Sequence, residues 1–270
     1  MSNFQISLCQ TPVADDKALN LQTAKAAIEM AALAGSHLVA LPEMFNCPYG
    51  KEYFDSYAEE FPQGKTIKLL SALAKKHSLY LIGGSIPEKE NTQLYNTCFV
   101  FGPEGQLLAR HRKVHLFDID IPGQISFKES ETLTPGDTVT FFDTPFCRVG
   151  IAICYDIRFP EFTRLMALKG ANLVVLPAAF NMTTGPAHWE LTMRARALDN
   201  QIYLAAISPA RDQTANYVAY GHSMVAGPWG NVISQANANP AIVTAEIDLA
   251  QLSKIREQLP LLKHRKPEIY

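Results

Sequence analysis

The chain has 270 residues, of which 47% are hydrophobic and 19% charged, with a formal net charge of −2. This balance is typical of a globular protein with enough apolar residues for a substantial core. A net charge so near zero gives no indication of nucleic acid or an anionic membrane as a partner. Because no apolar run approaches the ~18 residues of a membrane span and the first ten residues lack a signal-peptide pattern, we expect no membrane association.

The cysteines argue against a disulfide framework. Their number is odd and no Cys-x-x-Cys pair occurs, so neither a set of bridges nor a zinc ribbon is expected. We therefore predict a reducing compartment, the cytoplasm. Separately, we expect neither a metal nor another cofactor. The five are Cys9, Cys47, Cys98, Cys147 and Cys154.

In the first half, hydrophobic periodicity predicts alternating strands and helices. Strands are expected at residues 4–9, 38–41 and 80–83, and helices at 18–33 and 66–76, with an aromatic loop at 45–53. Residues 95–101 and 105–113 are expected to pair as a hairpin.

The second half begins with a predicted long loop at residues 117–136. Further along, strands are expected at 139–142, 146–153, 173–176, 202–207, 221–225 and 242–247, and helices at 161–169, 188–200 and 249–259. No Ser/Gly-rich linker divides the chain. We therefore expect one domain over residues 1–270, with 260–270 as an extended basic tail.

An internal repeat indicates how these elements are arranged. Residues 34–45 match residues 169–180 at a constant offset of 135, and both end a strand with Leu-Pro. Residues 6–10 similarly resemble 151–155. The sequence thus predicts an α/β protein of two related halves, packed sheet to sheet as a four-layer α-β-β-α sandwich.

Cys154 lies where the apolar strand pattern of residues 149–153 gives way to a polar helix start. A thiol at the carboxyl end of a strand and next to a helix N-terminus is well placed for a nucleophile. The alternative is a packed core cysteine, since free cysteines are among the most buried residues. Cys9 has a similar strand-end position but is followed by Gln-Thr-Pro, so we rank it lower.

Two further residues have both a catalytic and a structural interpretation. Glu43 ends an apolar strand, where desolvation would raise the pKa of its carboxyl toward that of a general base; otherwise it is a rim residue paired with a cation. If the segment is extended, its side chains alternate between two sides, and Lys113 would lie on the same side as His115 and Phe117. The alternative is that the basic run around Lys113 forms a solvated face. The local sequence around Glu129, taken by itself, is typical of a surface charge.

Three segments together resemble the motifs of the nitrilase (carbon–nitrogen hydrolase) superfamily. They are Leu41-Pro42-Glu43, residues 112–117 and residues 150–161. Residues 115–123, 180–189 and 208–212 resemble its omega-amidase branch. This resemblance implies the sandwich fold already predicted and a homodimer or larger homo-oligomer. The segment after the cysteine and the C-terminal tail commonly take part in such contacts.

The resemblance also implies a set of catalytic roles. Cys154 would be the nucleophile, Glu43 the general base and Lys113 the stabiliser of the oxyanion. Glu129 would be a second acid that orients the others, and the backbone N–H of Tyr155 a further oxyanion donor. No cofactor is implied.

For the omega-amidase branch, the implied substrate is a small 2-oxo dicarboxylate monoamide, such as 2-oxoglutaramate or 2-oxosuccinamate. Arg158 is the candidate for its far carboxylate, because guanidinium binds carboxylate through two parallel hydrogen bonds; the other possibility is a salt bridge at a helix start. Phe117, Phe180 and Thr184 are candidate pocket walls.

Other functions remain open at this point. An amidase for deaminated glutathione and an N-carbamoyl hydrolase would share the same catalytic residues. A Cys-His hydrolase would use His115, His188 or His222 in place of Glu43. A binding protein on the same scaffold would leave all of these residues without a chemical role.

Overall fold

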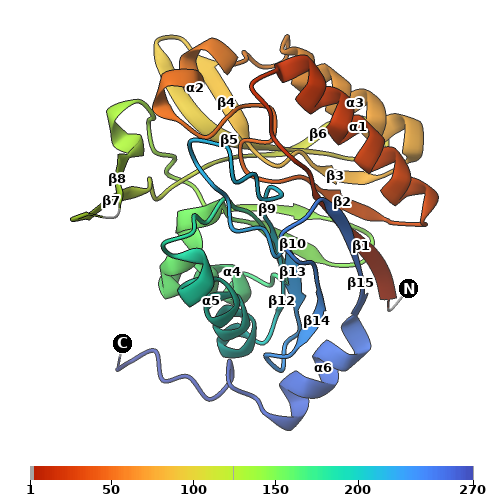
Figure 1. Cartoon of the computed structure of the whole chain (residues 1–270). Helices are drawn as coiled ribbons and strands as arrows, with labels where there is room; N and C mark the ends of the chain where they lie inside the picture. The colour runs from red at the N-terminus through yellow and green to blue at the C-terminus, as the bar shows by residue number, and fades with distance from the viewer. Residues whose placement is uncertain (1–2, 124, 270) are drawn as a thin grey trace.

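The computed structural model describes residues 3–123 and 125–269, and its centre is formed by two β-sheets (Figure 1). The strands of the first sheet are β1 (Asn3–Gln10), β2 (Leu38–Ala40), β3 (Tyr80–Ile82), β4 (Ile86–Glu90), β5 (Gln93–Phe101), β6 (Leu107–Arg112) and β15 (Ala241–Asp248). Their order is β15-β1-β2-β3-β5-β4, and β6 pairs with β5.

The second sheet is built from the other half of the chain. Its strands are β9 (Thr140–Asp143), β10 (Arg148–Ile151), β11 (Leu173–Pro177), β12 (Tyr203–Ile207), β13 (Met224–Ala226) and β14 (Val232–Gln235). Their order is β14-β13-β12-β11-β10-β9. A separate hairpin pairs β7 (Asp118–Ile121) with β8 (Ile125–Lys128).

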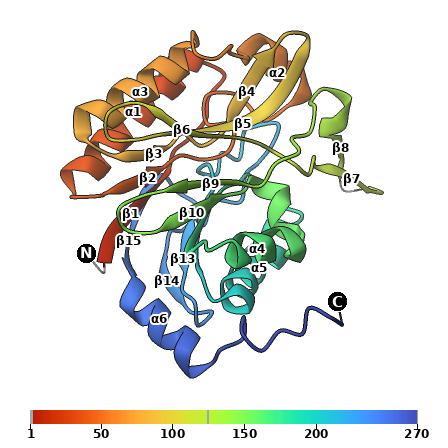
Figure 2. The same ribbon diagram turned by 180° about the vertical axis from the view of Figure 1, so that it is seen from behind.

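Helices form the outer layers of the molecule. The helices of the described chain are α1 (Lys17–Leu33), α2 (Lys51–Tyr57), α3 (Lys65–His77), α4 (Pro160–Leu168), α5 (Gly185–Asn200) and α6 (Leu249–Gln258), and there are short 3₁₀ turns η1 (Glu129–Glu131) and η2 (Cys154–Arg158). α1 and α3 lie beyond the first sheet, and α4 and α5 beyond the second (Figures 1 and 2).

The apolar side chains explain this layering. Ile6 and Leu38 of the first sheet belong to the same buried cluster as Val149 and Leu173 of the second. A second cluster lies between the first sheet and its helices and includes Ile28 of α1. Strands buried on both faces have continuous apolar sequences, as β2 and β11 do. The predicted α-β-β-α sandwich is confirmed.

The two halves repeat one topology, as the sequence predicts. Leu38 of β2 pairs in parallel with Ile6 of β1 and Tyr80 of β3. Leu173, its match in the repeat, pairs in parallel with Val149 of β10 and Tyr203 of β12. The loops that follow β2 and β10 each start at the carboxyl end of a strand that pairs in parallel within its sheet, where α/β proteins place their sites.

Some local predictions are wrong. Residues 117–136, expected to form a long loop, contain the β7–β8 hairpin, and α2 begins inside the loop expected at 45–53. The strand expected at 221–225 begins at Met224, and β4 and β14 were not predicted. The other predicted helices and strands are confirmed, with ends shifted by a few residues. Residues 261–263 and 267–269 form turns, and Tyr270 lies outside the described residues.

Candidate active site

Glu43 lies in a tightly constrained turn after β2 and is fully buried. The next residue, Met44, has a left-handed backbone (φ 51°), and its N–H donates to Ser85 Oγ at 3.1 Å. Gly84 (φ 54°) packs against this turn so closely that a Cβ would lie 2.1 Å from Pro42 O. The backbone around Glu43 thus has little freedom to move.

Cys154 begins the η2 turn just beyond β10 and is only 5% exposed. Its backbone is left-handed (φ 44°), which is uncommon for residues other than glycine and persists only where the surroundings hold it. Asp156 closes the turn, because its Oδ2 accepts from the Ile153 N–H at 3.0 Å. A sharp turn between a strand and a helix is a known way to present a nucleophile.

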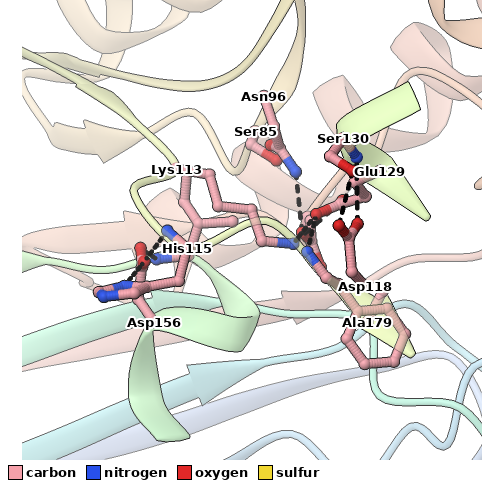
Figure 3. Close-up of polar contacts among 12 residues, drawn as sticks. Ser85, Asn96, Lys113, His115, Asp118, Glu129, Ser130, Asp156 and Ala179 are labelled. Carbon is pink, nitrogen blue, oxygen red and sulfur yellow. Dashed lines mark hydrogen bonds and ion pairs between the residues drawn. The ribbon is translucent and has the colours of Figure 1, made fainter. Parts of the chain in front are cut away.

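Lys113 follows β6 directly and its side chain has no exposure to solvent. Its Nζ lies 2.9 Å from Glu43 Oε1 and 2.8 Å from Glu129 Oε2. Figure 3 shows the extended side chain directed toward Glu129. The solvated interpretation of the basic run is therefore wrong for this residue.

Glu129, at the start of η1, is buried as well, so its local interpretation as a surface charge is wrong. Its Oε2 accepts from the Phe117 N–H at 2.6 Å, and its Oε1 accepts from the Tyr49 hydroxyl at 2.6 Å. These bonds hold Glu129 against Lys113.

The two oxygens of Glu43 have different surroundings. Oε1 accepts from Lys113 Nζ and from Asn96 Nδ2, both at 2.9 Å. Oε2 is buried, and no group among the described residues donates a hydrogen bond to it. One oxygen is thus fixed in place while the other has free lone pairs.

The three charges determine one another's protonation. Burial opposes the ammonium form of Lys113, but Glu129 and Glu43 together raise its pKa above the ordinary value, so it stays charged. Burial raises the pKa of Glu43; Lys113 lowers it and Glu129 raises it, with a net upward shift from 4.5. Glu43 therefore binds a proton more readily than an exposed carboxylate does.

The thiol of Cys154 is protonated at neutral pH. Burial raises its pKa well above 9.0, the charge of Glu43 raises it further, and Lys113 lowers it by less. A neutral thiol is a weak nucleophile, so attack requires a base that removes its proton. Glu43, which interacts electrostatically with this thiol, is such a base.

Cys154 opens onto a small cavity. All four side chains predicted to contact substrate line it, and so does Tyr155. The lining is Phe117, Cys154, Tyr155, Arg158, Ala179, Phe180, Thr184 and Tyr217. A wider cavity, lined in part by Glu43, Tyr49 and Tyr217, shares the Tyr217 wall. The roles of the lining residues stay predictions.

Arg158 contributes a positive charge to this cavity. Its Nη1 lies 3.0 Å from His188 Nδ1, and its guanidinium carbon is 4.6 Å from the centre of the Phe180 ring. No carboxylate of a residue in the described ranges forms an ion pair with it. The alternative interpretation of Arg158, a salt bridge at a helix start, is therefore not seen among the described residues.

Sequence reasoning missed four residues of the cluster: Tyr49, Asn96, Asp156 and Tyr217. Tyr217 stacks on Tyr49 with ring centres 4.5 Å apart, and its hydroxyl donates to Ala179 O at 2.5 Å. Asp156 had a usable signal, since it follows Cys154 by two residues. The other three come from segments whose position depends on tertiary contacts.

The alternative nucleophile, Cys9, is buried in the core, and the histidines of the alternative Cys-His mechanism contact other residues. Cys9 lies in the core beside α1, where burial raises its pKa to about 12. His115 Nδ1 bonds Asp156 at 2.8 Å, His188 bonds Arg158, and the His222 ring stacks on Tyr220. In the described part of the chain, no group of His, Cys, Asp or Glu is arranged to hold a metal ion.

The sequence profile of the carbon–nitrogen hydrolases matches residues 5–257. The chain belongs to this family. It is 56% identical to omega-amidase NIT2-A of Xenopus laevis and 53% identical to omega-amidase NIT2 of Homo sapiens, covering all of this chain and 98% of each relative.

A solved structure agrees with this family assignment. Nit3 of Saccharomyces cerevisiae, described as a member of branch 10 of the nitrilase superfamily, superposes with a TM-score of 0.91 at 41% identity. The match covers 98% of this carbon–nitrogen hydrolase and 97% of Nit3. Within the described residues, no helix is long and apolar enough to cross a membrane.

Proposed function

We propose that this carbon–nitrogen hydrolase is an omega-amidase. It hydrolyses the terminal amide of small 2-oxo dicarboxylate monoamides, such as 2-oxoglutaramate and 2-oxosuccinamate, to the acid and ammonia. The observation that supports this most is the buried Glu43–Lys113–Glu129 cluster beside Cys154, in a chain more than half identical to omega-amidases over its full length.

In the first step, Cys154 Sγ attacks the amide carbonyl while its proton passes to Glu43 Oε2, the oxygen with free lone pairs. The carbonyl oxygen becomes an oxyanion next to Lys113 and the Tyr155 N–H. That N–H lies in the first turn of η2, where backbone donors have no partner within the turn. Glu43 then gives the proton to the nitrogen, the C–N bond breaks and ammonia leaves.

In the second step, Glu43 takes a proton from water and the resulting hydroxide adds to the thioester carbonyl. The same oxyanion donors act again. The C–S bond breaks, the acid is released and the Glu43 proton returns to the sulfur. Glu129 holds Lys113 in place through both steps. This matters because the loss of one oxyanion donor typically lowers the rate by roughly 100- to 1000-fold.

The residues that line the cavity suit the chemistry of a small anionic amide. Arg158 has no carboxylate partner among the described residues, so it is available for the far carboxylate of the substrate. Phe117 and Phe180 supply apolar walls and Thr184 a hydroxyl. His188 accepts from Arg158 and orients the guanidinium.

The test is ammonia release from 2-oxoglutaramate, 2-oxosuccinamate, deaminated glutathione and an N-carbamoyl amino acid, compared as kcat/KM. We expect the two 2-oxo amides to be the best substrates and an acyl adduct on Cys154 to be trapped by mass spectrometry. Cys154→Ala should abolish turnover, while Cys9→Ala, at the corresponding strand end, should retain it. Preference for another amide, or turnover without Cys154, would contradict the proposal.

We also propose that the protein acts as a homodimer in the cytoplasm. The outer faces of α4 and α5 expose Leu165, Leu168, Leu191 and Leu198, side chains that a partner would remove from water. The described cysteines are all free thiols, as a reducing compartment maintains them.

A further inference from the structure

Asp156 is a buried carboxylate that the proposed mechanism does not use. It lies in η2, two residues after Cys154, and has no exposure. Its Oδ1 accepts from the His115 backbone N–H at 2.9 Å and from His115 Nδ1 at 2.8 Å. Its Oδ2 accepts from the Ile153 N–H at 3.0 Å and from His111 Nε2 at 3.3 Å. These four bonds use the full acceptor capacity of a carboxylate.

The donors come from both sides of the active site. Ile153 immediately precedes Cys154. His111 and His115 lie two residues before and two residues after Lys113 in the sequence. In Figure 3 the bonds between Asp156 and His115 lie at the base of the Lys113 side chain.

We propose that Asp156 is a positioning residue that sets the placement of Lys113 relative to Cys154, with His111 and His115 as its partners. The inference rests on the proposed function, in which Lys113 and Cys154 act on the same carbonyl group. One buried carboxylate joins the backbone before the nucleophile to the backbone and imidazole of His115 and to the imidazole of His111.

The two imidazoles are themselves held in place. His111 Nδ1 lies 2.9 Å from Thr140 Oγ1, which leaves Nε2 to donate to Asp156. The His115 ring stacks on Phe159 with centres 3.8 Å apart. Burial opposes the charge of Asp156, but the hydrogen bonds from His111, His115 and the Ile153 N–H, together with the electrostatic effect of His111, give a net lowering of its pKa. Asp156 is therefore a charged acceptor, which makes the stronger hydrogen bonds.

The first test is Asp156→Asn, which keeps the size but turns an NH₂ group toward one pair of donors. Because a misplacement of about 1 Å costs on the order of 100-fold in rate, we expect kcat to fall by about that factor with little change in KM. Glu59→Gln is the matched control. Glu59 is also buried and accepts from Thr66 N at 2.8 Å, at the start of α3. The Glu59→Gln variant should have a lower melting temperature but an unchanged kcat.

A second pair of variants separates positioning from packing. His115→Asn retains a side-chain N–H close to the position of Nδ1, so it should keep most of kcat. His115→Leu loses this donor, and we expect a loss of about tenfold, as for other residues that orient catalytic groups. Equal kcat values for the two would contradict the proposal.

A third measurement does not depend on amide turnover. The titratable groups that interact with the Cys154 thiol are Glu43, Lys113, Tyr49 and Tyr217. Lys113 lowers the pKa of Cys154, so its displacement should move the pH profile of Cys154 alkylation by iodoacetamide to higher pH. The Cys154 peptide is followed by mass spectrometry in wild type, Asp156→Asn and Glu59→Gln.

The outcomes distinguish this inference from the proposed function. If the wild type hydrolyses no amide, the proposed function fails, while the alkylation profile still reports the placement of Lys113. A folded Asp156→Asn protein with wild-type kcat, or with an unchanged alkylation profile, would overturn the positioning role of Asp156.

Discussion

Two carboxylates and one ammonium give the buried cluster a net negative charge, and this charge determines how the site responds to pH. The pKa of Glu43 is raised above 4.5, first by burial, against the opposing charge of Lys113, and also by Glu129. A general base must be unprotonated, so kcat/KM should fall as the pH drops through this raised pKa. We expect the acid limb of the kcat/KM profile above pH 4.5, measured where circular dichroism shows folded protein.

Glu129→Gln tests the cause of this shift. Removing the negative charge of Glu129 removes one contribution that raises the pKa of Glu43, so the acid limb of the residual activity should move to lower pH. A limb that stays in place would show that Glu43 is not the group that titrates.

Arg158 should determine which amides are good substrates. A hydrogen bond to a charged group contributes about 1.5–3 kcal/mol, so Arg158→Ala should lower kcat/KM for 2-oxosuccinamate by about 10- to 100-fold. A neutral amide such as butyramide makes no such bond and should be nearly unaffected. Arg148→Ala, which removes an exposed arginine paired with Asp143, is the control. Equal losses for both amides would remove Arg158 from substrate recognition.

At the scale of single elements, the sequence predicts strands that are buried for their whole length better than strands at the periphery. β2 and β11 are uninterrupted apolar runs, so their own residues specify them. β4 contains Pro87 and three charged residues, and it forms because β5 pairs with it. β7 and β8 pair only with each other, outside both large sheets.

The same distinction explains which site residues could be found. Glu43, Lys113 and Cys154 each follow a strand with a clear pattern, so their approximate positions were predictable. Glu129 was expected in the site only from the resemblance to a family. The placement of Tyr49 and Tyr217 depends on long loops meeting, and no local pattern encodes that.

The turn after β2 can be tested through Gly84. In Gly84→Ala, a Cβ at 2.1 Å from Pro42 O would push the peptide just before Glu43. Left-handed backbone costs an L-residue about 1–2 kcal/mol, and the overpacking adds roughly 1–3 kcal/mol. We expect a loss of stability in urea unfolding and a lower kcat.

Gly170→Ala is the control for this variant. Gly170 is also left-handed (φ 94°), but a Cβ there would meet nothing within 4 Å among the described residues. It should show the backbone cost alone, with kcat unchanged. If Gly84→Ala is no less stable than Gly170→Ala, the close approach to Pro42 does not constrain the turn.

At the scale of the whole molecule, the site exists because the two related halves are held in a fixed position relative to each other. Glu43 and Lys113 come from the first half, and Cys154 and Tyr217 from the second. Between the sheets, Gln10 Oε1 accepts from Ser223 N at 2.8 Å and from Ser223 Oγ at 2.7 Å. The repeat in the sequence predicts that the halves match, but this buried polar contact between them is visible only in the fold.

In the proposed dimer, the partner subunit would pack against the helices next to the nucleophile and help to hold Cys154 in place. α4 begins at Pro160, directly after the η2 turn that contains Cys154 and Arg158, and Leu191 on the neighbouring α5 is 70% exposed. A charge in an apolar interface is costly, so Leu191→Glu should give a monomer in light scattering and a lower kcat. Leu33→Glu, at an 87% exposed leucine on α1 in the opposite layer, should remain dimeric and fully active. A monomeric wild type, or dissociation caused by Leu33→Glu instead, would place the interface elsewhere or remove it.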